Sequence, residues 1–308
     1  MSPKTDQYAL ESQLKRWIEH DPDPVTREHL VTLLNRSDAP AIENLFNSRI
    51  QFGTAGLRGQ LGPGPSRMNQ LTVRRLATGL ASYLGAGSRV VLGRDARHKS
   101  KDFLDDIAAV LTANDIDVIV FPEVIPTPLL AFSVRHLKTD MGIMVTASHN
   151  PSSDNGCKVY MRDGAQLRAP IDEEIDKLIR ESEFPSINLP QGNGTLVNAD
   201  RGLEEAYCAA ITKSLTQQNT KTRIAYTPLH GVAMRLIQKS FTKAQAGEII
   251  PVKTQMVPDA DFPTVSFPNP EEHGVMDSVT DLAKASNADL ALANDPDGDR
   301  LAVAIPTL

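Results

Sequence analysis

Two apolar patterns alternate along most of the chain: segments with apolar residues at helical spacing, and short uninterrupted apolar runs. Helical spacing covers residues 71–83, 102–113, 129–137, 203–215, 232–243 and 277–286. Apolar runs typical of buried strands cover residues 90–92, 116–121, 140–145, 223–226, 249–252, 290–293 and 301–305. Because the two patterns alternate, the chain is predicted to fold as α/β layers around mainly parallel sheets.

The regions before and between these segments have a different character. Helical spacing at 8–18 and 25–35 is interrupted by Asp21-Pro22-Asp23-Pro24, whose prolines must end the first helix. The single tryptophan, Trp17, belongs to that helix and is predicted to pack rather than to recognise a ligand. Residues 185–194 form a polar linker, and the proline-rich stretch 257–270 forms a long loop.

Composition limits the classes of protein to consider. The chain has 308 residues, of which 41% are hydrophobic, enough for about two ordinary domains. Its net charge is −6 and it has no block of basic residues, so no nucleic-acid partner is indicated. Cys157 and Cys208 lack metal-ligand or disulfide-framework spacing, which fits a reducing compartment. With a polar start and no apolar run long enough for a bilayer, we expect a cytoplasmic protein with no membrane segment and no obligate protein partner.

An acidic loop lies between the last two apolar runs. Asp295, Asp297 and Asp299 occupy every second position, so in extended backbone their carboxylates point the same way and converge on one cation, while Gly298 lets the chain curve around it. Oxygen-only ligands favour magnesium over zinc. An EF-hand is excluded, because its sixth and twelfth places require Gly and Glu and here hold Arg and Pro. A solvated turn would explain an isolated Asp-x-Asp, but three aspartates between apolar runs favour a metal loop.

Ser148 follows the apolar run 140–145, where α/β enzymes place reactive groups. The nucleophile elbow of the α/β-hydrolases requires glycines at the places that Thr146 and Asn150 occupy here, so a serine hydrolase is not indicated. His149 would point away from the serine in extended backbone and would be a poor base for it. A simple polar turn after the strand is the alternative reading of this segment.

Three motifs together resemble those of one family. The segment 146–151 (Thr-Ala-Ser-His-Asn-Pro), followed by 155–158 (Asn-Gly-Cys-Lys), resembles the phosphoserine loop of the α-D-phosphohexomutases, the phosphoglucomutase and phosphomannomutase group. The segment 295–300 resembles their magnesium loop, and 52–59 their N-terminal active-site loop. The resemblance implies an α/β protein with two three-layer α/β/α domains containing mainly parallel mixed sheets, preceded by a short helical N-terminal extension.

The resemblance also implies boundaries. The helical extension is predicted over 1–45, the family's domain I, with the phosphoserine loop, over 46–190, and its domain II, with the magnesium loop, over 200–308. Domains III and IV, which read the sugar and clamp its distal phosphate in the family, are expected to be absent. This chain alone is therefore predicted to be an inactive truncation of a mutase.

By the same resemblance, Ser148 is phosphorylated in the resting enzyme and donates its phosphoryl group to a sugar monophosphate. The bisphosphate then returns its other phosphoryl group, so that phosphate moves between C1 and C6 of a hexose, glucose or mannose phosphate being favoured. One Mg²⁺ per chain is expected on a phosphoserine oxygen of Ser148 and on Asp295, Asp297 and Asp299. A sugar 1,6-bisphosphate is the expected activator.

Basic residues inside the matched motifs receive roles on the same ground. Lys158 is the predicted general base, because a desolvated ammonium loses its proton more easily. Without the resemblance it would read as a surface lysine on a hairpin. Arg58 and Arg300 offer planar forks for phosphate oxygens. His149 is a candidate for hydrogen bonding to phosphate or for proton transfer.

Other features receive weaker interpretations. The glycines of 52–59 fit neither a dinucleotide fingerprint nor a Walker loop, so no nucleotide is implied. Residues 93–95 (Gly-Arg-Asp) are assigned to the scaffold, with a capping role for the next helix. Arg74 and Arg75 are predicted to lie on a solvated helix face. His230 is as consistent with a structural role as with a functional one.

Three alternative functions stay open at this point. A phosphopentomutase of the same family would use the same residues. A non-catalytic fragment that binds sugar phosphate would keep the motifs without turnover. An aspartyl-phosphate phosphatase using Asp295 and Asp297 is less favoured, because that chemistry usually has Thr at the place of Asp299.

Overall fold

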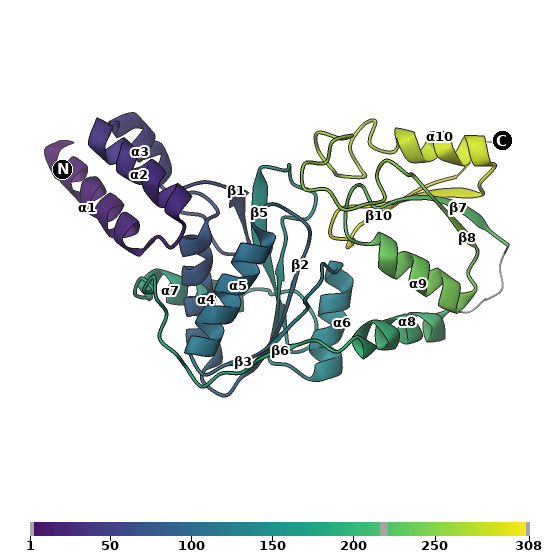
Figure 1. Ribbon diagram of the computed structural model, residues 1–308, viewed down its shortest axis with the longest axis horizontal. Helices are drawn as coiled ribbons and strands as arrows, with labels where there is room; N and C mark the ends of the chain where they lie inside the picture. Colours follow the sequence, from purple (N-terminus) through teal and green to yellow (C-terminus); the bar gives the residue numbers. More distant parts are fainter. Residues whose placement is uncertain (1–2, 216–220, 306–308) are drawn as a thin grey trace.

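The computed structural model describes residues 3–215 and 221–305, and three regions follow one another along its long axis (Figure 1). Helices cover α1 Pro3–His20, α2 Pro24–Arg36, α3 Ala39–Phe46, α4 Gln70–Leu84, α5 Ser100–Ala113, α6 Thr127–Leu137, α7 Ile171–Glu181, α8 Gly202–Ser214, α9 Met234–Ala244 and α10 Asp277–Ser286. Strands cover β1 Leu57–Gln60, β2 Arg89–Arg94, β3 Asp117–Val120, β4 Met141–Val145, β5 Asp154–Met161, β6 Leu196–Asn198, β7 Arg223–Thr227, β8 Glu248–Pro251, β9 Leu290–Asn294 and β10 Leu301–Ala304.

The first domain is built on a sheet with the described strand order β1-β5-β4-β2-β3-β6. Strands β4, β2, β3 and β6 run parallel, whereas β5 is antiparallel to both β4 and β1. The strands at the centre are almost pure apolar runs, as expected for strands covered on both faces. The carboxyl ends of β2 and β4 therefore meet at one edge of the sheet, and the loops that follow them lie side by side.

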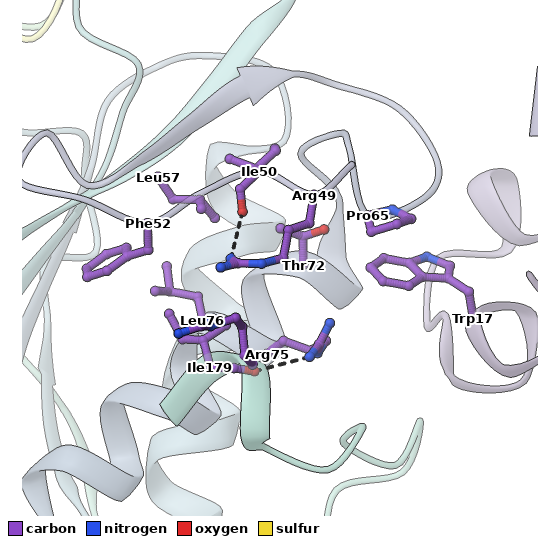
Figure 2. A pocket seen from close by; sticks show the side chains of 11 residues that line it. Trp17, Arg49, Ile50, Phe52, Leu57, Pro65, Thr72, Arg75, Leu76 and Ile179 are labelled. Atoms are coloured by element: carbon purple, nitrogen blue, oxygen red, sulfur yellow. Dashed lines mark hydrogen bonds between the residues drawn. The ribbon is translucent and has the colours of Figure 1, made fainter. Parts of the chain in front are cut away.

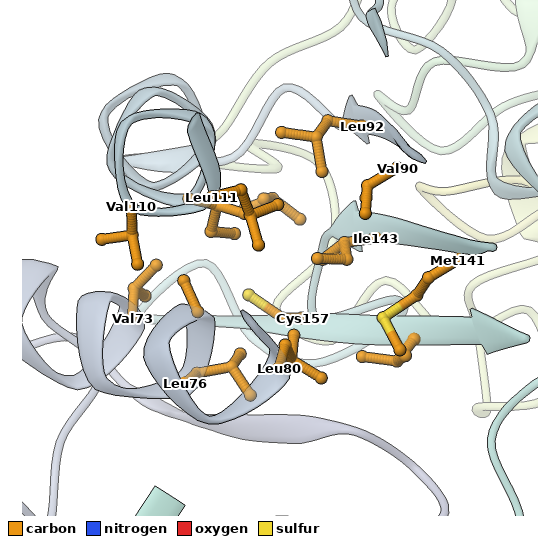
Figure 3. Close-up of a cluster of buried hydrophobic side chains, with 14 of the residues drawn as sticks. Val73, Leu76, Leu80, Val90, Leu92, Val110, Leu111, Met141, Ile143 and Cys157 are labelled. Atoms are coloured by element: carbon orange, nitrogen blue, oxygen red, sulfur yellow. The ribbon is translucent and has the colours of Figure 1, made fainter. Parts of the chain in front are cut away.

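Helices cover both faces of this sheet. Helices α4, α5 and α7 pack on one face, and the core beneath them draws side chains from α4, α5, β2, β4 and β5 (Figure 3). Helix α6 packs on the other face, and α8 lies against it. Cys157 on β5 is fully buried in the first of these cores, which agrees with a structural thiol. Burial raises the pKa of this thiol to about 12, so it is inert as a nucleophile.

The second domain has the described strand order β10-β9-β7-β8. Strands β9, β7 and β8 run parallel and β10 is antiparallel at the edge. Helix α10 packs over β7 and β9, and α9 packs on β8 and against α8. Both domains are thus α/β/α layers with mainly parallel mixed sheets, and the predicted fold class is confirmed.

The N-terminal helices form a small bundle on the first domain. Leu14, Trp17, Leu30 and Phe46 are buried with Leu71 of α4, so the bundle and the domain share one apolar cluster. Trp17 makes edge-on contacts with Phe46 and Phe184 at centroid distances of 6.1 and 5.7 Å. The tryptophan therefore packs, as predicted, and also lines a cavity described below.

Some elements were not predicted. Strand β5 escaped notice because polar Asn155 and Lys158 interrupt its apolar pattern, although both are buried in the fold. The short strands β1 and β6 carry too few apolar residues to form a run. The predicted linker 185–194 and the loop 257–270 contain no helix or strand. Across residues 3–215 and 221–305, no helix is both long and apolar enough to cross a membrane.

Candidate active site

Ser148 lies in the loop that leaves the carboxyl end of β4. Its backbone is left-handed, with φ 55°, and the Thr146 hydroxyl accepts a hydrogen bond from the Ser148 amide at 2.9 Å. A serine in this region of backbone space is uncommon and needs surrounding structure to hold it. The residue itself is almost fully buried.

Arg97 provides that support, and the sequence analysis missed it. Its guanidinium donates to the carbonyl oxygens of Ser148 at 2.7 Å and Asn150 at 2.6 Å, and also to those of Pro151 at 2.7 Å and Asp154 at 3.1 Å. Only a planar fork of several donors can span four carbonyls at once. The available signal was an arginine just past β2, a strand whose carboxyl end adjoins that of β4.

Asp95 lies beside Arg97 in this buried cluster. The Arg97 Nε atom is 3.4 Å from an Asp95 carboxylate oxygen, and the Ser100 hydroxyl at the start of α5 donates to the same carboxylate at 2.7 Å. The predicted contact of 93–95 with the start of the next helix is therefore present. The segment also anchors the arginine that holds the serine loop.

The three aspartates leave β9 in a tight turn rather than in extended backbone. The Gly298 amide donates to the Asp295 carbonyl at 2.9 Å, and Gly298 has φ 74°. The extended-backbone explanation was wrong, whereas the expected curve at Gly298 is present: the carboxylates converge because the chain reverses, not because alternate side chains share a face. One carboxylate oxygen from each of Asp295, Asp297 and Asp299 lies within 4.8 Å of the others.

The turn is packed tightly against its surroundings. A Cβ atom on Gly231 would lie 2.2 Å from the Pro296 carbonyl oxygen, so only glycine fits at that position. The amide of Thr127, at the first turn of α6, donates to the Asp297 carbonyl at 2.8 Å, and its hydroxyl donates to the carboxylate at 2.6 Å. The positive end of the α6 dipole thus faces a negative side chain.

The two loops meet across the domain junction. The Ser148 hydroxyl donates to an Asp295 carboxylate oxygen at 2.7 Å. Lys158, on β5, lies 2.6 Å from Asp297 and also pairs with Asp299. The tertiary structure therefore brings together the serine, the lysine and the three aspartates, although 147 positions separate Ser148 from Asp295 along the chain.

Electrostatics in this cluster is dominated by burial and by the ion pairs. Burial alone would lower the pKa of Lys158, but Asp297 and Asp299 outweigh it and the pKa is raised. The expectation of a readily deprotonated ammonium does not hold in this arrangement, because two carboxylates stabilise the charge. Burial raises the pKa of Asp295, and the neighbouring carboxylates of Asp297 and Asp299 raise it further. Burial would raise the pKa of Asp297 as well, yet the adjacent Lys158 lowers it.

The donor set suits a hard cation. All the candidate ligand atoms are oxygens, from three carboxylates and one hydroxyl, and oxygen ligands are those that Mg²⁺ prefers. The Asp297 Oδ1 atom is buried and has no hydrogen-bond partner within the described part of the chain. A buried unpaired carboxylate oxygen beside two further carboxylates is an available ligand position.

His149 lies closer to the serine than expected. Its Nδ1 atom is 3.3 Å from the Ser148 hydroxyl, because the left-handed backbone at Ser148 turns the following side chain back. The expectation that the ring points away was therefore wrong. Burial lowers the pKa of His149, and the charges of Arg300 and Arg58 lower it further. A lowered pKa favours the neutral ring, whose unprotonated nitrogen can accept a proton.

Arg58 and Arg300 flank the cluster. Arg58 lies on β1 opposite Gly156 of β5, and its Nε atom is buried without a partner among the described residues. A side chain at Gly156 would collide with Arg58, since a Cβ there would lie 2.9 Å from the arginine Cγ. Arg300 is 40% exposed and lies 3.7 Å from Glu271.

The two adjacent arginines of α4 and His230 lie in other parts of the fold. Arg74 and Arg75 are not on a solvated face: Arg74 pairs with Asp106 at 2.6 Å with its side chain 12% exposed, and Arg75 packs on Phe184. Helix α4 places both side chains against the segment that follows α7. The periodicity of the helix sequence does not indicate that contact. His230 is buried, with its Nε2 atom 2.8 Å from the Thr264 hydroxyl, and serves the packing of its loop.

Fold and site together define a class: a two-domain α/β protein that places one serine against a carboxylate cluster suited to a hard cation. Comparison with known families agrees. Residues 49–186 match the phosphoglucomutase/phosphomannomutase α/β/α domain I, and residues 205–307 match domain II. The chain belongs to the α-D-phosphohexomutase family.

Curated relatives carry more than one name. The chain is 36% identical to the phosphoribomutase of Saccharomyces cerevisiae and to the phosphopentomutase of Homo sapiens, each time over 96% of its own length and 52% of theirs. It is also 36% identical to a phosphoglucomutase of Staphylococcus aureus (strain USA300), over 94% of the chain and 53% of that protein. The chain thus spans about half the length of the curated relatives it matches.

Solved structures share the fold. A phosphoglucomutase/phosphomannomutase family protein from Burkholderia thailandensis is 26% identical, with a TM-score of 0.68 over 81% of this chain and 53% of that one. Parafusin from Paramecium, 17% identical, shares the fold with a TM-score of 0.59 over 84% of this chain and 54% of that one.

Proposed function

We propose that this chain carries the phosphoserine and metal-binding part of an α-D-phosphosugar mutase. In this proposal Ser148 alternates between hydroxyl and phosphate, and the net reaction moves a phosphoryl group between C1 and the terminal hydroxyl of a sugar. The observation that carries the proposal is the 2.7 Å hydrogen bond from the Ser148 hydroxyl to Asp295, inside a convergent cluster of three carboxylates.

Each phosphoryl transfer requires positioning and charge neutralisation more than covalent activation. We propose that Asp295, Asp297 and Asp299 hold one Mg²⁺ together with the Ser148 oxygen. A bound Mg²⁺ would neutralise charge on the phosphoryl oxygens during transfer. Arg58 and Arg300 would bind further phosphate oxygens, because their forks match phosphate geometry.

Proton transfer falls to Lys158 and His149. In transfer to the sugar, the bond from phosphorus to the serine oxygen breaks, a bond to the sugar oxygen forms, and the sugar hydroxyl loses its proton. Lys158 can accept that proton only as the neutral amine, so its ammonium must first release a proton to solvent. That release would become easier when a cation bound by Asp297 and Asp299 weakens their ion pairs with Lys158. His149 is placed to exchange a proton with the serine oxygen.

The substrate is proposed as a hexose phosphate, glucose or mannose phosphate, with a sugar 1,6-bisphosphate as the activating phosphoryl donor. A pentose phosphate is the second candidate. The pentose phosphate is supported by sequence similarity: relatives named phosphoribomutase and phosphopentomutase are as similar to this chain as one named phosphoglucomutase. A non-catalytic sugar-phosphate-binding role would use the same residues. It differs from a mutase in that Ser148 would not become phosphorylated.

Phosphorylation of Ser148 tests the proposal. Purified protein is incubated with Mg²⁺ and either glucose 1,6-bisphosphate or ribose 1,5-bisphosphate, and phosphopeptides are located by mass spectrometry. We expect phosphate on Ser148, and the better donor identifies the sugar class. Ser153→Ala, at an exposed serine of the same loop, is the matched control and should label normally. Phosphate on other serines with Ser148 unmodified would show the assignment to be wrong.

A further inference from the structure

A cavity lies between the N-terminal helices and the first domain, away from the serine site. Its volume is about 370 Å³, within the range of small-molecule sites. Residues from α1, from α3 and the segment after it, from α4 and from the chain after α7 line it, including Arg16, Trp17, Phe46, Arg75 and Phe184. None of the candidate active-site residues is among them.

Positive charge is concentrated around this cavity. Arg16, Arg49 and Arg75 line it. Arg49 and Arg75 also line a smaller adjoining space of about 30 Å³ (Figure 2), and Arg180 contributes to the same lining. Asp176 pairs with Arg49 at 2.6 Å and with Arg180 at 3.3 Å. Arg16 and Arg75 have no carboxylate partner among the side chains that the structure describes, those of residues 8–215 and 221–305. Uncompensated guanidinium groups at a concave site favour an anion.

The arginines are held in place by an aromatic side chain. The guanidinium carbons of Arg16 and Arg75 lie 4.4 and 4.6 Å from the ring centroid of Phe184. Stacking leaves the N–H groups at the edge of each guanidinium available to other acceptors, because the aromatic ring covers only a face of the guanidinium plane. Arg75 donates one bond to the Ile179 carbonyl at 3.1 Å, while its Nε atom is buried with no partner in the described part of the chain. Both arginines are therefore held in position, and both have N–H donors without an acceptor among the described residues.

Trp17 supplies the apolar half of the cavity. It is 3% exposed, lines both spaces, and contacts Phe46 and Phe184 edge-on. Its indole Nε1 is buried and makes no hydrogen bond to the described residues. Aromatic side chains next to several arginine guanidiniums favour a ligand with a flat organic part and an anionic group.

We propose that this cavity is a binding site for a small organic phosphate. The phosphate lies on Arg16, Arg49 and Arg75, and the organic part lies against Trp17 and Phe46. The site is distinct from the proposed catalytic cluster and holds its ligand without transferring the phosphoryl group. Because the cavity joins α1 to α4, the ligand stabilises the docking of the N-terminal helices on the first domain.

The sole tryptophan of the chain makes the site directly observable. Phenyl phosphate serves as the probe, and inorganic phosphate and phenol serve as the two half-ligands, each titrated while Trp17 fluorescence is followed with excitation selective for tryptophan. We expect saturable change with phenyl phosphate and apparent affinity at least about tenfold above that of either half-ligand. Ser148→Ala should leave the response unchanged, which separates this site from phosphate bound at the serine loop.

Charge variants complete the test. Arg75→Gln should weaken binding about tenfold, and Arg16→Gln, whose side chain is exposed, about threefold. Since the Arg16 side chain makes no hydrogen bond to the described residues, its variant keeps the test valid if Arg75→Gln unfolds. Lys15→Gln removes the same charge from the neighbouring position, where Lys15 pairs with Glu11, and should bind normally.

Two results would overturn the assignment. The first is the absence of a saturable Trp17 response to phenyl phosphate. The second is a response of equal affinity in the wild type, Arg16→Gln and Arg75→Gln. Inorganic phosphate binding as tightly as phenyl phosphate would refute the organic part of the ligand and leave a simple anion site.

Discussion

Replacement of Arg97 by lysine should loosen the serine loop while keeping the positive charge. The guanidinium spreads its donors over the carbonyls of Ser148, Asn150, Pro151 and Asp154 at 2.6 to 3.1 Å. A lysine ammonium places its three donors on one nitrogen and cannot reach all four oxygens. We therefore expect at least two buried carbonyls to lose their protein partner.

The magnitude follows from those lost bonds. A hydrogen bond to a charged donor contributes about 1.5 to 3 kcal/mol, so two lost bonds destabilise the first domain by about 3 kcal/mol at the lower end of that range. The left-handed backbone at Ser148 is itself costly and loses one of its supports. Misplacement of the serine hydroxyl should reduce its phosphorylation rate about tenfold or more.

The assay pairs urea unfolding with the rate of Ser148 phosphorylation by glucose 1,6-bisphosphate. Arg168→Lys is the matched control, because Arg168 is 74% exposed and lies 3.7 Å from Asp163. The control should match the wild type in both measurements. Unchanged stability together with unchanged phosphorylation in Arg97→Lys would refute the claim that this arginine holds the loop.

Three further predictions concern other parts of the molecule. Asp297→Asn should weaken Mg²⁺ binding about tenfold in calorimetric titration, because a charged oxygen ligand is lost; equal affinity would contradict the metal assignment. Gly231→Ala should displace Pro296, lower stability by about 1 to 3 kcal/mol in urea unfolding and weaken Mg²⁺ binding. Burial would raise the pKa of Asp176, but the hydrogen bond and charge of Arg49 outweigh it and the pKa is lowered. That ion pair therefore stabilises above the ordinary aspartate pKa of about 3.9 and is lost as pH falls below it. Asp176→Asn should cost about 1 kcal/mol at neutral pH and nothing near about pH 2 in unfolding curves at several pH values.

Controls for these variants are available in the chain. Gly53→Ala should be tolerated, since a Cβ there has no atom within 4 Å, whereas equal behaviour of Gly53→Ala and Gly231→Ala would contradict the packing argument. For Asp176→Asn, a destabilisation that persists undiminished at low pH would show that the ion pair is not its cause.

The sequence alone determined the layers of the fold and the identity of the reactive loops. Apolar runs and helical spacing are local properties, so strands such as β4 and helices such as α5 could be predicted with nearly correct bounds. Strand β5 could not, because Lys158 and Asn155 become acceptable in a buried strand only when distant partners satisfy them. The sequence motifs likewise named Ser148, Lys158 and the three aspartates as candidates before any geometry was known.

Only the tertiary structure decided how those residues interact. The left-handed backbone at Ser148 and the fork of Arg97 set the directions of side chains, and neither follows from the alternation of positions along the chain. The charge state of Lys158 was decided by carboxylates on the other domain. Local pattern encodes burial and backbone preference, whereas hydrogen bonds and ion pairs between loops depend on contacts that exist only after both domains have folded.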